Sequence, residues 1–197
     1  MIDHNFIEGW LFQDEDELLS KYASICNGNI LEIGSFRGKS TVILADVLKE
    51  PYKVYTIDVH APIDYYELKT DDTGMPIEFK ATGKRNVLKY HNCKMFYDNI
   101  TKCGLFDKIV LIGLPSQEAY KVCPFENIGL LFIDGNHNFS NVRQDFNNYS
   151  KLINDDGIVI FHDSNQDDIK RVIDGFTEGW KVIENCMTMT VMQKENK

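Results

Sequence analysis

The sequence predicts an α/β fold built on a doubly wound, mostly parallel sheet. Short apolar runs alternate with helical patterns along most of the 197 residues, which is typical of βαβ units. Right-handed crossovers between parallel strands then place helices on both faces of one sheet. The last two predicted strands are joined by too few residues for a parallel connection, so one of them should run antiparallel.

The chain opens with a predicted N-terminal helical segment, residues 1–27. The acidic run Asp14 to Glu17 falls in a first helical turn, where the helix dipole favours acids, and we interpret it as a solvated helix start. The apolar residues that follow at helical spacing are expected to be buried; they are Leu18, Leu19, Tyr22 and Ile25.

The later elements are predicted from short apolar runs and from apolar residues at helical spacing. The predicted strands are 30–33, 54–57, 108–113, 129–134, 158–162, 181–184 and 187–193. The predicted helices are 40–48, 84–105, one from 116, 140–153 and 167–178, and residues 154–157 predict a turn. Residues 61–83 show no regular pattern and are a candidate lid, with a disordered excursion as the alternative.

The first predicted strand carries Glu32 and turns through Gly34 and Gly38 into a helix. Glycines let a backbone approach a ligand closely, and a helix N-terminus offers free N–H groups. A buried carboxylate is costly unless it is hydrogen-bonded, and Glu32 would repel a phosphate but suit a ligand with an ammonium group and hydroxyls. The alternative is a structural strand–turn–helix without a ligand.

This motif, Glu32-x-Gly34-x-x-x-Gly38, resembles the first motif of class I S-adenosylmethionine (SAM) dependent methyltransferases. Its form is similar to the catechol O-methyltransferase-like enzymes and to small bacterial methyltransferases near the macrocin O-methyltransferase and cephalosporin-hydroxylase groups. The resemblance implies one Rossmann-like domain over 1–197, with a seven-stranded sheet and one antiparallel strand near the C-terminus. It also implies that SAM binds along this motif, at Glu32, Gly34, Phe36, Gly38 and Ser40.

Further cofactor contacts are expected after the second and third strands. Asp58 ends the second strand at a distance from Gly38 that suits an acid accepting both ribose hydroxyls, a geometry that NAD and SAM share. The alternative is an acid that caps a loop. The resemblance implies that Ser116 and Gln117 hydrogen-bond the adenine edge, with a simple Ser helix cap as the alternative.

Asp134 and Asp163 follow neighbouring predicted strands and offer oxygen ligands suited to Mg²⁺ or Ca²⁺. The catechol-type pattern has Asn directly after the second acid, but here Ser164 intervenes. The alternatives are that Asp134 contacts the cofactor and that Asp163 caps a helix. His137 stands where the catechol-type pattern has its lysine base, so it is the candidate general base, with a structural role as the alternative. His162 is expected to be a packing or hydrogen-bonded residue, with the general base as the alternative.

Composition limits the function further. A net charge of −9 and a pI near 5.0 argue against a nucleic-acid substrate. The apolar runs are too short to span a membrane, no signal peptide opens the chain, and five scattered cysteines without a C-x-x-C fit a reduced cytoplasm. A homo-oligomer is left open.

The sequence therefore predicts a SAM-dependent methyltransferase that O-methylates a small hydroxylated acceptor, a sugar or a natural product, with or without a divalent cation. Two other functions are kept as alternatives. One is a non-catalytic SAM-binding module. The other is an NAD-dependent oxidoreductase, against which Glu32 and the missing G-x-G-x-x-G count.

Overall fold

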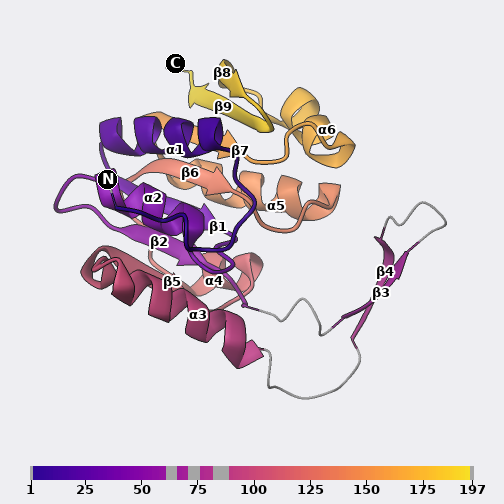
Figure 1. The fold of residues 1–197 in the computed structure, drawn as a ribbon. Helices are drawn as coiled ribbons and strands as arrows, with labels where there is room; N and C mark the ends of the chain where they lie inside the picture. Colours follow the sequence, from indigo (N-terminus) through magenta and orange to yellow (C-terminus); the bar gives the residue numbers. More distant parts are fainter. Residues whose placement is uncertain (1, 61–65, 71–75, 82–88, 196–197) are drawn as a thin grey trace.

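A computed structural model describes residues 2–60, 66–70, 76–81 and 89–195 of the chain (Figure 1). Its main sheet has seven strands in the order β5-β2-β1-β6-β7-β9-β8. Their bounds are β1 Asn29–Ile33, β2 Val54–Ile57, β5 Ile109–Ile112, β6 Ile128–Ile133, β7 Ile153–Phe161, β8 Trp180–Cys186 and β9 Met189–Lys194. The predicted fold class is confirmed: the first five strands are parallel, and β9 runs antiparallel to both β7 and β8.

Helices cover both faces of this sheet, as Figure 1 shows. The helices are α1 Gln13–Ile25, α2 Lys39–Val47, α3 Lys89–Lys102, α4 Ser116–Val122, α5 Phe139–Tyr149 and α6 Asp167–Phe176, with 3-10 turns at Phe106–Lys108 and Ser150–Leu152. One core layer packs α1, α2 and α3 against the sheet, and the other packs α4, α5 and α6. The doubly wound arrangement is therefore present.

The two core layers arise from the alternation of side chains along each strand. In β1, Ile30 belongs to the core beneath α1 and α2, whereas Leu31 belongs to the core on the opposite face. All six residues of β6 are buried, which explains its unbroken apolar sequence. The sheet therefore has a filled layer on each side and leaves the carboxyl ends of its parallel strands for a ligand.

Two local predictions are wrong. Residues 154–157 form no separate turn but belong to β7, where a register shift against β6 pairs Ile128 with Ile153 and Leu130 with Ile158. The extra residues of β7 bulge out of the ladder at that point. Ile25 was expected to be buried, yet 63% of it is exposed at the end of α1.

The segment predicted to be irregular, 61–83, contains two strands. β3 (Tyr66–Thr70) and β4 (Pro76–Ala81) pair antiparallel in a separate two-stranded sheet. The rest of this candidate lid and the predicted helical residues 84–88 lie outside the described residues. In the part of the chain that is described, no helix is both long enough and apolar enough to cross a membrane.

Candidate active site

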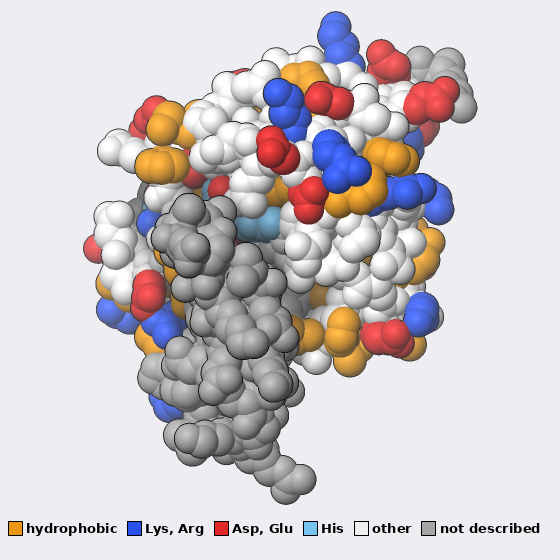
Figure 2. All heavy atoms as spheres, turned by 90° about the vertical axis from the view of Figure 1, so that its right-hand side faces the viewer, with side chains coloured by type: hydrophobic (Ala, Val, Ile, Leu, Met, Phe, Trp, Pro, Cys, Tyr) orange, Lys and Arg blue, Asp and Glu red, His pale blue; other side chains and the backbone are white. Residues whose placement is uncertain are grey.

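A cavity of about 570 Å³ lies at the carboxyl ends of the parallel strands. This is where ligands bind in open α/β sheets, and the volume suits a small molecule. Figure 2 shows a face of the molecule on which histidine lies in a recess beside acidic side chains. The cavity brings together most of the predicted site residues, namely Gly34, Phe36, Ser40, Asp58, Ser116, Gln117, Asp134, His137 and Asp163.

The turn after β1 forms one wall, and Gly34 makes it possible. Gly34 has φ +91°, and a Cβ there would lie 2.1 Å from the carbonyl oxygen of Asp134. Only glycine therefore lets the β1 turn approach the β6 turn so closely. Phe36 has φ +47°, a left-handed conformation that is uncommon for a residue with a side chain. Such a backbone persists only where its surroundings hold it.

Asp58 supplies that support. Its Oδ2 accepts hydrogen bonds from the backbone N–H groups of Ser35 at 2.9 Å and Phe36 at 2.7 Å. Its Oδ1 accepts one from the N–H of His60 at 2.5 Å. Asp58 thus fixes the glycine turn and also lines the cavity. The ribose contact of Asp58 remains a prediction. Its carboxylate also stabilises the glycine turn, whether or not a ligand is bound.

Glu32 and Gly38 do not line the cavity. Glu32 is fully buried and accepts hydrogen bonds from Ser40 Oγ at 2.5 Å and Thr41 Oγ1 at 2.6 Å, which joins β1 to the first turn of α2. Burial raises the pKa of Glu32 to about 7, although these hydroxyls lower it. The N-cap of α2 is Gly38, where a Cβ would lie 3.1 Å from the ring of Phe96 in α3. The ligand contacts expected of Glu32 and Gly38 remain predictions.

At the other end of the cavity, Ser116 and Gln117 meet an acid that the sequence analysis missed. Asp145 in α5 is only 2% exposed and lines the cavity. Its Oδ1 accepts a hydrogen bond from Ser116 Oγ at 2.6 Å and lies 3.5 Å from Gln117 Nε2. Burial raises the pKa of Asp145 to about 6, although the Ser116 bond lowers it. The available signal was an acid within the apolar stripe of α5, three residues after Val142.

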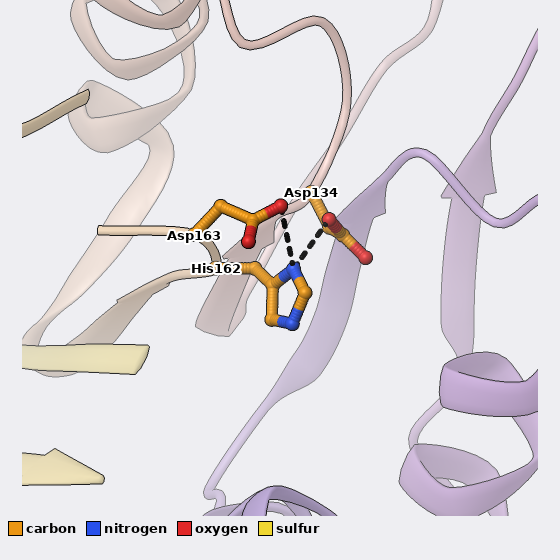
Figure 3. Close-up of side chains that lie close together, drawn as sticks. All are labelled: Asp134, His162 and Asp163. Carbon is orange, nitrogen blue, oxygen red and sulfur yellow. Dashed lines mark ion pairs between the residues drawn. The ribbon is translucent and has the colours of Figure 1, made fainter. Parts of the chain in front are cut away.

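The loops after β6 and β7 bring Asp134, His162 and Asp163 together, as Figure 3 shows. Nδ1 of His162 lies 2.9 Å from Asp134 Oδ1 and 3.4 Å from Asp163 Oδ2. Among the described residues this buried nitrogen has no aligned hydrogen-bond acceptor, so the contacts are ion pairs. Burial lowers the pKa of His162, but the two carboxylates outweigh it and raise the pKa to about 10. His162 also lowers the pKa of Asp163.

His137 lies at the rim of this acid–histidine cluster. Its Nδ1 is 3.4 Å from Asp163 Oδ2, and its Nε2 is 3.8 Å from Asp134 Oδ1. Gln166 Nε2 lies 3.2 Å from the same Nδ1. The contact with Asp134 raises the pKa of His137, against the effect of burial. The predicted base and the two predicted metal ligands therefore share one end of the cavity, with His162 among them.

An aromatic pair lines the cavity at the glycine turn, to which Phe36 belongs. The ring centroids of Trp10 and Phe36 are 4.9 Å apart, and 67% of Trp10 is exposed.

The interpretation of Asp14 to Glu17 as a solvated run is wrong for Glu15. This side chain is fully buried, and its Oε2 lies 3.4 Å from Nε2 of His162. Glu15 also accepts a hydrogen bond from the N–H of Phe12 at 3.0 Å, so its spacing three residues into the helix start matches half of a capping box. That local pattern was visible in the sequence, but the contact with a residue 147 positions away was not.

A parallel sheet with antiparallel β9 between β7 and β8, and a glycine turn after β1, defines a class I methyltransferase fold. A family model described as a methyltransferase domain matches residues 31–164, more than half of the chain. The chain therefore belongs to this methyltransferase family, and the resemblance inferred from the first motif is confirmed. No curated protein sequence matches the chain.

Solved structures share the fold. The O-methyltransferase NovP is 15% identical, with a TM-score of 0.70 over 93% of this chain and 80% of its own. An O-methyltransferase from Bacillus cereus, in complex with S-adenosylhomocysteine (SAH), is 17% identical, with a TM-score of 0.65 over 95% and 83%. TomG from Streptomyces achromogenes, in complex with SAM, is 14% identical, with a TM-score of 0.66 over 95% and 82%. At these identities the matches establish the fold alone.

Proposed function

We propose that the protein transfers a methyl group from SAM to a hydroxyl oxygen of a small acceptor. The observation that carries this proposal is the cavity, which joins the glycine turn and Asp58 to the acid–histidine cluster. The structurally similar Bacillus cereus enzyme and TomG are O-methyltransferases that bind SAH and SAM. Their chemistry supports the same reaction class for this chain.

The cofactor would lie along the wall made by the glycine turn, Asp58 and the Ser116 region. Asp58 keeps acceptor capacity on the cavity side for ribose hydroxyls, since Oδ1 accepts only one backbone N–H among its described contacts. Ser116, Gln117 and Asp145 offer donors and an acceptor for the adenine edge. The other end of the cavity, at the acid–histidine cluster, is then left for the acceptor.

The acid–histidine cluster fits a divalent cation. The ligand atoms of Asp134, His162 and Asp163 all lie within 4.8 Å of one another, and Nδ1 of His162 is buried without an aligned acceptor. We propose that His162 is a ligand together with the two acids, a role that the sequence analysis had not given it. One imidazole and two carboxylates suit Mn²⁺, Fe²⁺ or Zn²⁺ better than they suit Ca²⁺, which prefers oxygen ligands alone. When bound, such a cation lowers the pKa of an acceptor hydroxyl.

His137 is the proposed general base. It lies at the cavity end of the cluster, where an acceptor hydroxyl would meet the cofactor. In the transfer the bond from sulfur to the methyl carbon breaks as the bond from the acceptor oxygen to that carbon forms. The hydroxyl proton passes to a ring nitrogen of His137, which later releases it to solvent. The products are SAH and the methyl ether. The rate acceleration comes from positioning of the two reactants and from proton transfer.

Turnover with labelled SAM and a panel of glycosides and phenols tests this function. The His137→Ala protein should keep its SAH affinity in calorimetry and lose roughly 10²–10⁴-fold in turnover. His4→Ala is the control, because His4 pairs with Asp16 and does not line the cavity. Near wild-type turnover of His137→Ala would refute the base. SAH binding without turnover on any acceptor would favour a non-catalytic SAM-binding module.

The cation is tested separately by titrating Mn²⁺ into the metal-free protein and following the free ion by electron paramagnetic resonance. Asp163→Asn should weaken Mn²⁺ binding, since it removes a charged ligand. Activity that survives dialysis against EDTA unchanged, together with no measurable Mn²⁺ binding, would leave the acids as cofactor and helix-capping groups.

A further inference from the structure

Behind the acid–histidine cluster lies a third carboxylate, that of Glu15 from the first turn of α1. Its side chain is fully buried, and its Oε2 accepts a long hydrogen bond of 3.4 Å from Nε2 of His162. The other ring nitrogen of His162 faces Asp134 and Asp163. His162 is thus held between a carboxylate on its buried side and two carboxylates on its cavity side.

Glu15 is fixed by groups other than His162. Its Oε1 accepts hydrogen bonds from the backbone N–H of Thr188 at 2.9 Å and from Thr188 Oγ1 at 2.6 Å. Its Oε2 accepts the N–H of Phe12 at 3.0 Å. A buried carboxylate is tolerated when hydrogen bonds satisfy both oxygens, and here they do. The position of Glu15 is therefore set by α1 and by the β8–β9 turn, and His162 has to conform to it.

The same turn also holds the other end of the cluster. The carbonyl oxygen of Thr188 accepts hydrogen bonds from the backbone N–H of Ser164 at 2.7 Å and from Ser164 Oγ at 2.8 Å. Ser164 directly follows Asp163, whose φ of +52° is left-handed. Such a conformation costs free energy and persists because the surroundings impose it. Glu15, Thr188 and Ser164 therefore form one chain of bonds that ends at both His162 and Asp163.

We propose that Glu15 is a positioning residue for the proposed cation site. By accepting the Nε2–H of His162, it fixes the ring orientation and leaves Nδ1 as the nitrogen that faces Asp134 and Asp163. Histidines that bind metals commonly donate their second N–H to a carboxylate in this way. The inference rests on the proposed function for the cation, whereas the orientation of His162 can be tested without any metal.

The test compares Glu15→Gln with Glu184→Gln. Glu184 accepts hydrogen bonds from Lys21 Nζ and Tyr22 Oη, so it ties the same helix to β8 yet has no described contact with the cluster. Both variants loosen α1 from the hairpin, and both should lower the melting temperature. Only Glu15→Gln alters the acceptor of His162, because its amide can place an NH₂ group against Nε2.

Two readouts separate positioning from packing. Mn²⁺ affinity should fall about 10–100-fold in Glu15→Gln and stay at the wild-type value in Glu184→Gln. In metal-free protein, proton–nitrogen NMR should show the Nε2 proton of His162 shifted downfield and protected from exchange in wild type and in Glu184→Gln, and lost in Glu15→Gln. A lower melting temperature with unchanged Mn²⁺ affinity and an unchanged His162 signal would overturn the proposal.

Each failure can be recognised. If the wild type binds no Mn²⁺, the cation function fails, and the His162 signal alone decides whether Glu15 orients the ring. If Glu15→Gln does not fold, Thr188→Val takes its place, since it removes one hydrogen bond to Glu15 and leaves the backbone bond. A His162 signal and Mn²⁺ affinity unchanged by Thr188→Val would then overturn the proposal.

Discussion

Replacing Asp58 with alanine should destabilise the protein even before any ligand is added. The change leaves three backbone N–H groups without their acceptor, those of Ser35, Phe36 and His60. A hydrogen bond to a charged group contributes about 1.5–3 kcal/mol, but water in the cavity can replace part of each bond. We therefore expect a loss of about 3 kcal/mol, less than the sum, because neighbouring bonds are not additive.

Urea unfolding and differential scanning calorimetry of the ligand-free protein measure this effect. For a chain of this length, about 3 kcal/mol corresponds to a melting temperature lower by about 6–12 °C. Asp58→Asn should lose less, since its amide oxygen can still accept. Asp155→Ala is the control, because Asp155 is 99% exposed and its described contact is a distant pair with Lys194. An Asp58→Ala protein that melts like the wild type would refute the argument.

Further predictions concern residues in and behind the cavity wall, with a glycine of α6 as a control. Because burial raises the pKa of Glu32 from 4.5 to about 7, the folded state holds its proton more tightly than the unfolded state. The contribution of Glu32 to the free energy of unfolding should therefore fall by about 3 kcal/mol as the pH rises from about 4.5 to 7. Urea titrations should show that Glu32→Gln lacks this fall. Parallel pH profiles of stability for the wild type and Glu32→Gln would contradict the prediction. Gly34→Ala should destabilise far more than Gly38→Ala, because its Cβ would meet backbone at 2.1 Å rather than a ring at 3.1 Å. Gly175→Ala in α6, where no described atom lies within 4 Å of a Cβ, should raise the melting temperature slightly. Asp145→Asn should weaken SAH binding about tenfold if its carboxylate accepts the adenine amino group, an effect of about 1.4 kcal/mol in calorimetry. An unchanged SAH affinity would exclude that contact.

The fold could be predicted because its signals are local. The parallel strands are short apolar runs next to glycine turns, and the crossover helices show apolar residues at helical spacing. The pairing of β3 with β4 was missed although both sequences alternate, with Tyr66 and Leu68 in β3 and Ile77 and Phe79 in β4 separated by charged residues. The prolines, the glycine and the acidic cluster of the segment favoured an irregular loop instead. The bulge in β7 was missed because Asn-Asp-Asp-Gly has the composition of a turn.

The candidate site was predictable where a functional residue directly follows a strand. Asp58 and Asp134 do so, Asp163 follows β7 one residue later, and the topology brings all three to one edge of the sheet. The partners of His162 were not predictable, because its contact with Glu15 joins opposite ends of the chain. Glu15 also stands in a run of four acids, and a local pattern cannot show which of the four is buried.

Three fully or almost fully buried acids support the cavity, Glu15 and Glu32 from behind its lining and Asp145 within it, and each accepts hydrogen bonds from hydroxyl groups. Glu15 is bonded to Thr188, Glu32 to Ser40 and Thr41, and Asp145 to Ser116. Each therefore joins two elements of the wall: α1 to the hairpin, β1 to α2, and α5 to α4.

A carboxylate without water is expensive to bury, so these bonds must form together with the fold and hold it in one arrangement. Preorganised sites depend on such supporting bonds as much as on the groups that touch the ligand. Substitution of a supporting acid should therefore change stability and ligand binding together. Substitution of His137, which lies at the cavity rim, should change turnover while stability is kept. That contrast separates the supporting residues of the wall from the residues that carry out the reaction.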